Sequence, residues 1–197
     1  MSKYFLHYDE KAKINYCFLF SLFLIAERNT KEHINNIILY DTQKELSDRI
    51  KEKCNYNISA SGISRILKNT EEYKIYFTKP EAENRIILNN NFKRGAAASN
   101  KFIILNEAEI LFLLNQNNKL LNKYYLYLKY YCGFSRSKYI DTTANQILSA
   151  IGYSANCGSN KAALCKFNSL LLEQGFITIT KSKDNKGYSR NIYKMNL

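Results

Sequence analysis

The sequence predicts an α+β fold that is mainly helical with small β-hairpins and that contains two copies of one unit. Each half of the chain has a pair of helices with a capping motif at its start, followed by strand-like residues. The two pairs match at a constant offset, and a polar segment separates them. With 197 residues the chain is long enough for two domains of about 100 residues each. We expect domains at residues 1–90 and 101–197, joined by a linker at residues 91–100.

A long apolar helix is expected at residues 9–28. Its central run at 14–26, INYCFLFSLFLIA, has 13 residues and is too short to span a bilayer. Two lysines precede the run, as in a secretory signal peptide, but two acidic residues interrupt that basic segment and no A-x-A site follows. The run is therefore interpreted as a buried helix, and no membrane partner is expected.

The first helix pair begins near residue 42. Thr42 and Glu45 have the spacing of a capping box, in which each side chain accepts a hydrogen bond from the other residue's backbone N–H. Leu46 and Ile50 follow one turn apart on one face, and Ser59 is expected to cap the second helix. The apolar positions of the second helix are Ile63 and Ile66, and Ile75 and Tyr76 lie in the strand-like segment KIYFT.

The segment NNNFKRGAAASN at residues 89–100 is polar and poor in large apolar side chains. This composition is typical of a connection between domains, and it supports the predicted linker. Residues 95–99 are compatible with the start of a short helix. The alanines at 96–98 are also compatible with an engineered replacement of other surface residues by alanine.

One or two helices are expected at residues 106–131, before the second copy. Their tyrosine-rich part, LLNKYYLYLKYY, raises the idea of base stacking on single-stranded nucleic acid. Core packing is the better interpretation, because the large side chains follow the i, i+3, i+4 pattern of a buried helix face. These side chains are Leu121, Tyr124, Tyr125, Leu128 and Tyr131.

The second helix pair begins with the capping box Thr143–Gln146, and Gly152 is expected to end its first helix. Ser159 is expected to cap the second helix, which Gly175 ends. Strands are predicted at 176–181 and 188–195. The inward positions are Ile147, Ile151, Leu164, Phe167 and Leu171, and the turn residues of the hairpin are Asp184, Asn185 and Gly187.

Residues 42–77 match residues 143–178 at an offset of 101 residues without a gap. The match covers the helix caps, the inward apolar positions and the start of the strand, although few residues are identical. We interpret the two segments as copies of one fold.

The net charge of +12 favours an anionic partner such as nucleic acid. Residues 1–100 carry 16 Lys and Arg against 12 Asp and Glu, whereas residues 101–197 carry 13 against 5. The excess therefore lies mostly in the second half. The chain is also rich in other residues that AT-rich codons encode, namely Asn, Ile, Tyr and Phe. An AT-rich gene is therefore a second explanation for part of the lysine content.

The composition offers little for catalysis or metal binding. The chain has five cysteines without a C-x-x-C pair, so neither a disulfide framework nor a zinc site is expected, and the thiols are interpreted as reduced and mostly buried. It has two histidines, scattered glycines without a phosphate-binding loop, and no clustered carboxylates. We expect no enzyme activity and no cofactor; a tyrosine nucleophile is the one catalytic alternative left among 16 tyrosines.

The pattern of two helices, a glycine turn and a basic hairpin is similar to the winged helix-turn-helix. Glu173-Gln174-Gly175-Phe176-Ile177 resembles the segment that joins the recognition helix to the wing, and Asn191-Ile192-Tyr193 resembles the end of the wing. The second half looks like the winged-helix domains of phage and plasmid replication proteins and related regulators. The tandem arrangement resembles plasmid replication initiators, and it implies two tandem winged helix-turn-helix domains.

The resemblance implies that the second helix of each pair reads the major groove while its flanks hold phosphates. In the second copy the candidate DNA-binding residues are Asn160, Lys161, Ala162, Cys165, Lys166 and Ser169 on the helix and Lys181, Lys183, Lys186 and Arg190 on the hairpin. In the first copy they are Ser61, Ser64, Arg65 and Lys68. Glutamates outnumber the basic residues of the first hairpin, so the first domain is expected to bind DNA weakly or to form a homodimer through its apolar first helix.

The leading hypothesis is a sequence-specific double-stranded DNA-binding protein of the replication-initiator or regulator type. It would be cytoplasmic, associated with the nucleoid, and a partner of the replication or transcription machinery. The alternatives are a transcriptional repressor or activator and a winged-helix adaptor that binds an acidic protein. A DNA-binding protein should show a DNA affinity that falls steeply with salt concentration, whereas an adaptor should form no such specific DNA complex.

Overall fold

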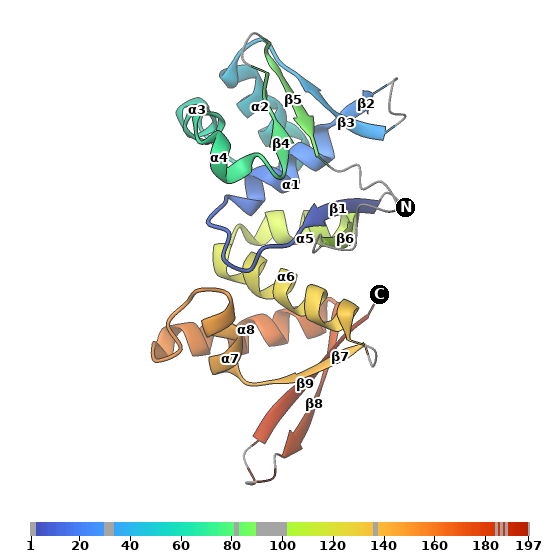
Figure 1. Ribbon diagram of the computed structural model, residues 1–197, viewed down its shortest axis with the longest axis vertical. Coiled ribbons are helices and arrows are strands. Elements are labelled where there is room, and N and C mark those ends of the chain that lie inside the picture. The colour runs from blue at the N-terminus through green and yellow to red at the C-terminus, as the bar shows by residue number, and fades with distance from the viewer. Residues whose placement is uncertain are drawn as a thin grey trace. The chain divides into compact units, whose positions relative to one another are not determined.

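A computed structural model describes residues 3–29, 34–80, 83–89, 102–135, 138–183, 185, 187 and 189–196. Within these ranges the fold is α+β, as the sequence predicts, and it contains eight helices and small antiparallel sheets (Figure 1). The chain forms two compact units. The first unit contains Met1–His7 and Ala12–Lys119, and the second contains Tyr8–Lys11 and Leu120–Leu197.

The units divide the chain differently from the predicted domains at 1–90 and 101–197. Strand β6 (Phe102–Asn106) and helix α5 (Glu107–Gln116) belong to the first unit. The reason is a non-local pairing, because β6 lies antiparallel to β1 (Lys3–His7) near the start of the chain, and α5 packs on α1 (Tyr16–Ile25). The predicted linker at residues 91–100 lies outside the described residues.

Helix α1 is shorter than the predicted helix at 9–28. Its start is fixed by Asn15, whose side chain accepts a hydrogen bond from the Phe18 N–H, and the chain becomes extended at Ala26. Nine of its ten residues are buried. The described residues contain no helix that combines the length and the apolar character needed to cross a membrane.

The first unit combines a four-stranded antiparallel sheet, in the order β2-β3-β5-β4, with helices that flank it. Helices α2 and α3 start at the predicted caps, because Thr42 accepts from the Glu45 N–H and Ser59 accepts from the Gly62 N–H. The Glu45 carboxylate accepts from the Asp41 N–H, so only the Thr42 half of the predicted capping box is formed. Strands β2 and β3 were not predicted, and the strand predicted at Ile75 begins at Phe77. The elements are β2 (Glu27–Asn29), β3 (Ile34–Leu39), α2 (Gln43–Cys54), α3 (Ala60–Lys68), α4 (Thr70–Tyr73), β4 (Phe77–Thr78) and β5 (Arg85–Leu88).

The described residues of the second unit form three helices and a three-stranded antiparallel sheet in the order β7-β9-β8. Strands β8 and β9 form a hairpin that projects beyond the helices of this unit (Figure 1). The elements are α6 (Lys119–Phe134), β7 (Tyr139–Thr142), α7 (Ala144–Ala150), α8 (Gly158–Glu173), β8 (Ile177–Lys183) and β9 (Ser189–Met195).

The capping box of α7 is confirmed. The Thr143 hydroxyl accepts from the Gln146 N–H at 3.3 Å, and the Gln146 side chain accepts from the Thr143 N–H at 2.9 Å. The predicted stop residues Gly152 and Gly175 each lie two positions after the last residue of α7 and α8, and both have positive φ angles, of 78° and 69°. The prediction that Ser159 caps α8 is wrong, because the helix begins two residues earlier.

The two units repeat one order of elements. Both contain the series helix, strand, helix, helix, strand, strand, which β2 and α4 interrupt in the first unit. In both, the first strand of the series lies beside the last: β3 beside β5, and β7 beside β9. The caps Thr42 and Thr143 are 101 residues apart, the predicted offset. The copies differ in other respects: α3 has 9 residues and α8 has 16, and β2 and α4 have no counterpart among the described residues of the second unit.

The tyrosine-rich helix α6 is part of the core of the second unit, as predicted. Leu121, Tyr124, Tyr125 and Leu128 are buried, and Tyr131 is half-buried. The segment Tyr8–Lys11 packs on the same helix. Tyr8 stacks on Tyr130 with ring centroids 4.4 Å apart, and the Tyr131 hydroxyl donates to the Glu10 carboxylate at 2.9 Å.

We predict that Thr143→Ala lowers the free energy of unfolding by about 1 kcal/mol, because α7 loses the acceptor for a backbone N–H at its start. The measurement is urea unfolding of the full chain. Ser149→Ala is the matched control, since Ser149 is exposed on the same helix. Equal stability of the two variants would contradict the role of the cap.

Candidate nucleic-acid interface

Helix α8 presents one face to the core and the other to solvent. Leu164, Phe167 and Leu171 are buried, as predicted from their spacing. The candidate DNA-binding residues of the opposite face are exposed together: Lys161, Ala162, Cys165, Lys166 and Ser169. The sequence therefore predicted correctly which side of this helix faces outward.

Asn160 has a different role from the exposed residues beside it. It is half-buried, and its side-chain amide donates to the Ser154 carbonyl at 3.1 Å. This bond holds the loop between α7 and α8 against the first turn of α8. The amide is thus engaged within the protein, whereas Lys161 next to it is exposed.

The hairpin places its basic residues on two faces. Lys181 lies opposite Asn191, Lys183 opposite Ser189, and Ser182 opposite Arg190. Because side chains alternate along a strand, Lys181 and Lys183 share one face and Arg190 lies on the other. Both lysines are exposed and Arg190 is half-buried. Lys186, the fourth basic residue predicted for the hairpin, lies outside the described residues.

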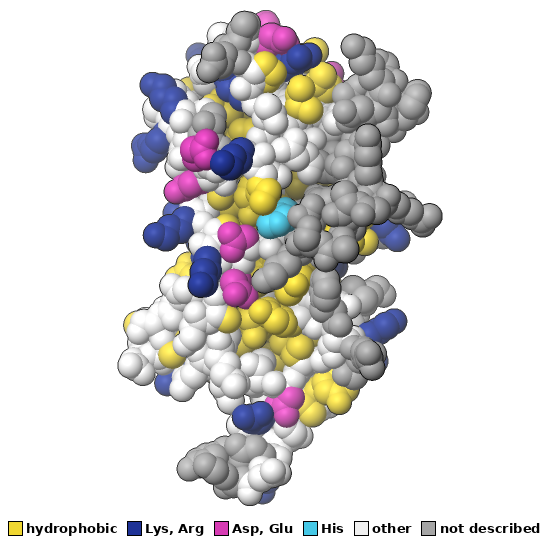
Figure 2. Space-filling model, in the orientation of Figure 1, with side chains coloured by type: hydrophobic (Ala, Val, Ile, Leu, Met, Phe, Trp, Pro, Cys, Tyr) yellow, Lys and Arg dark blue, Asp and Glu magenta, His cyan; other side chains and the backbone are white. Residues whose placement is uncertain are grey.

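An acidic residue accompanies the Arg190 face. Asp141 on β7 lies opposite Ile192, and its carboxylate accepts a hydrogen bond of 3.5 Å from the Ser182 hydroxyl. Figure 2 shows basic and acidic side chains next to each other where the hairpin projects. The Lys181 and Lys183 face is therefore the more strongly basic of the two faces among the described residues.

The charge of the second unit is concentrated around α8 and the hairpin. The residues of this unit include 12 Lys and Arg against 5 Asp and Glu. No acidic residue occurs between 142 and 172, which covers α7 and all of α8 except its last residue, Glu173. An anion approaching this surface meets lysines without opposing carboxylates from the helices.

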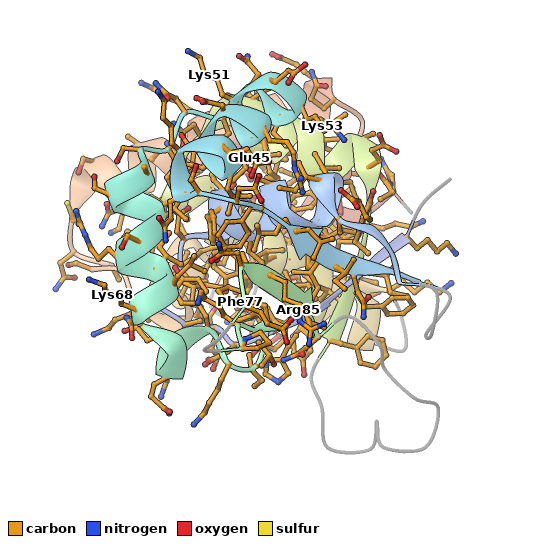
Figure 3. The ribbon with its side chains drawn as sticks, turned by 90° about the horizontal axis from the view of Figure 1, so that it is seen from above. Glu45, Lys51, Lys53, Lys68, Phe77 and Arg85 are labelled. Carbon is orange, nitrogen blue, oxygen red and sulfur yellow. The ribbon has the colours of Figure 1, made fainter. Side chains whose placement is uncertain are left out.

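The corresponding surface of the first unit has mixed charge. Ser61, Arg65 and Lys68 are exposed on α3 and Ser64 is half-buried, and Figure 3 shows Lys68 pointing away from the unit. Acidic residues follow at once, because α4 carries Glu71 and Glu72 in its single turn.

The hairpin of the first unit is also short and mixed in charge. Strand β4 has two residues and β5 has four, against seven in each strand of the second hairpin. The Glu71 carboxylate forms an ion pair with Lys74, and Glu83 forms one with Arg85. Both basic side chains are thus paired with carboxylates of the same unit.

The five cysteines divide into three buried and two exposed side chains. Burial raises the pKa of the Cys54 thiol and raises that of Cys132 to about 11. The exposed pair lies on α8: Cys165 on its outer face and Cys157 at its N-terminal cap. The Ser159 hydroxyl, 3.0 Å from the Cys157 sulfur, and backbone N–H groups of the first turn lower the pKa of Cys157.

Sequence reasoning missed a polar cluster behind α8. Asn168 lies on the inner side of this helix, between Tyr124 of α6 and Tyr193 of β9, and hydrogen bonds join the three side chains. The sequence signal for this cluster was Asn168 itself, a polar residue directly after the inward position Phe167. From the sequence alone, Asn168 was assigned to neither face of the helix.

No family model, curated protein or solved structure matches this chain. Among the residues that the structure describes, no three His, Cys, Asp or Glu side chains are grouped so that they could hold a metal ion.

We predict that two of the five thiols of the folded protein react rapidly with a disulfide reagent at pH 7, and that three react only on unfolding. Cys157 should react rapidly, because the hydrogen bonds that lower its pKa give more thiolate at that pH. Cys157→Ser and Cys165→Ser should each remove one rapidly reacting thiol. Rapid reaction of all five thiols would show that the buried cysteines are not protected as described.

Proposed function

We propose that the protein is a sequence-specific double-stranded DNA-binding protein with two winged helix-turn-helix domains, and that the second unit makes the main contact. The observation that carries this proposal is the surface formed by α8, which is basic and free of acidic residues up to its last position. A projecting hairpin with two exposed lysines on one face lies in the same unit. A protein that neutralises phosphates requires such an arrangement.

The order of elements supports the same proposal. In a winged helix-turn-helix, the second helix of the pair enters the major groove and the hairpin contacts the backbone beside it. In the second unit these elements are α8 and the β8–β9 hairpin. Lys161 and Lys166 would reach base edges or phosphates from the helix, and Lys181 and Lys183 would hold phosphates from the hairpin.

The first unit is proposed as the weaker DNA-binding partner. Its α3 carries Arg65 and Lys68, but α4 follows with two glutamates, and Lys74 and Arg85 are paired with carboxylates of the same unit. The hypothesis of a homodimer through α1 loses its physical basis, because the apolar side chains of α1 are buried against α2, α5 and β3 of the same unit. A dimer would have to use another surface.

An adaptor function is favoured by one observation, the mixed charge of the first unit, which suits a protein partner better than DNA. Replication initiation and transcription control both need a DNA-binding protein of the proposed kind, and the proposal covers either process. If the protein binds DNA as proposed, its location would be the cytoplasm, in association with the nucleoid.

Binding of the full-length protein to a random pool of duplexes, followed by sequencing of the bound fraction, tests the proposal. Fluorescence anisotropy on the recovered sequence should show an affinity that falls about 10³–10⁵-fold between 50 and 200 mM salt if six to ten phosphates are contacted. Recovery of no motif, with weak binding at all salt concentrations, would exclude sequence-specific DNA binding and favour the adaptor.

We predict that Lys166→Ala weakens binding to the recovered sequence by about 1–3 kcal/mol if Lys166 reads a base. Lys183→Ala should instead reduce the slope of log affinity against log salt by about 0.9, the value for one lost phosphate contact. Lys194→Ala is the matched control, because Lys194 is an exposed lysine of β9 on the opposite face of the sheet from Lys183. An equal effect of all three variants would indicate only a general loss of positive charge.

A further inference from the structure

We propose that Asn168 is a positioning residue that holds α8 and the β8–β9 hairpin in one fixed orientation, so that both contact the same DNA duplex. This inference rests on the proposed function. Asn168 itself is half-buried on the inner side of α8 and would not touch DNA.

The contacts of Asn168 join three elements of the second unit. The Tyr124 hydroxyl of α6 donates to the side-chain oxygen of Asn168. The side-chain nitrogen of Asn168 in turn donates to the Tyr193 hydroxyl of β9 at 3.5 Å. A side-chain amide is suited to this place, because it accepts with one atom and donates with the other.

The hydroxyl groups at both ends of this bridge need partners. Tyr124 and Tyr193 are 0% and 2% exposed. A buried hydroxyl without a partner costs about 1–3 kcal/mol, so Tyr124 favours the position of α8 in which Asn168 accepts its hydrogen bond, whereas Tyr193 also accepts one from Asn191. Burial, with Tyr193 nearby, raises the pKa of Tyr124 well above its ordinary value, and Tyr124 therefore remains protonated and able to donate.

The bridge continues toward the basic face of the hairpin. The Tyr193 hydroxyl also accepts from the Asn191 side chain at 3.0 Å. Asn191 lies directly opposite Lys181 in the register of β8 and β9. The chain of hydrogen bonds that begins on α6 thus ends at the cross-strand partner of the first hairpin lysine, on the face that also carries Lys183.

The first unit has an apolar side chain at the position that matches Asn168. The position 101 residues before Asn168 is Leu67, which is 6% exposed at the end of α3. An apolar side chain therefore serves as the inward residue there, and the fold itself does not require the amide. The unit that has the amide is the one with the long basic hairpin, which indicates a role in orienting that hairpin.

Asn168→Leu tests the inference, because it introduces the residue found at the matching position of the first unit. The double variant Tyr124→Phe/Asn168→Leu also removes the hydroxyl that would lose its acceptor, so it should fold even if the single variant does not. Thr143→Ala is the stability control, since it weakens α7 without touching the bridge. All are measured as full-length chains under conditions in which each variant is fully folded.

We expect the Asn168 variants to bind the recovered DNA sequence at least tenfold more weakly than the wild type. The slope of log affinity against log salt should fall by about 2, because Lys181 and Lys183 no longer reach their phosphates together with α8. Thr143→Ala should keep the wild-type affinity and slope. An unchanged affinity and slope in a folded Asn168 variant would overturn the inference and leave Asn168 a purely structural residue.

A second measurement needs no DNA. Residual dipolar couplings of the backbone amides of α8 and of β8–β9 should fit one alignment tensor in the wild type and require two in the Asn168 variants. A single tensor in both proteins would also overturn the inference. If the wild type binds no DNA sequence, the proposed function fails, and the dipolar couplings still decide whether Asn168 fixes the hairpin.

Discussion

The second unit depends on the burial of the tyrosines of α6 together with their hydroxyl groups. Tyr124 and Tyr125 are completely buried, and the ring of Tyr125 lies edge-on to Phe176 at the start of the hairpin, with centroids 5.8 Å apart. Large aromatic rings provide much of the apolar burial of a small unit, but each brings a polar group that must be satisfied. That requirement determines how α8 and β9 can pack on α6.

The outer surface of α8 follows from this inner constraint. Because Leu164, Phe167 and Leu171 take the inner face, the outer face contains small and basic residues that make no contribution to the core. Such positions are free to serve binding. The long β8–β9 hairpin belongs to the same unit. One of its faces carries the buried Ile177 and Tyr193 near the core and the exposed Lys181 and Lys183 farther along.

The parts of the fold that the sequence predicted are those determined by local chemistry. The caps Thr42 and Thr143 and the glycine ends of α7 and α8 depend on neighbouring residues alone. The missed parts depend on distant residues: β3 and β7 are short strands that exist through pairing with β5 and β9. For the same reason, α5 was placed in the second domain although β1 and β6 hold it in the first unit. The outer face of α8 was predictable from its period, whereas the bridge at Asn168 required knowledge of which tyrosines lie behind it.

The two units share a series of elements but differ in the residue that completes the inner face of the second helix of the pair. Leu67 and Asn168 occupy matching positions, and each completes the inner face of its helix. An apolar contact tolerates small sliding and rotation, because dispersion is not directional, whereas a hydrogen-bonded amide permits a narrow range of angles. The directional contact occurs in the unit whose hairpin is long, where a small rotation at the base moves the lysines near the tip by the largest distance. On the proposed function, the orientation of the hairpin therefore contributes to DNA binding together with its charge.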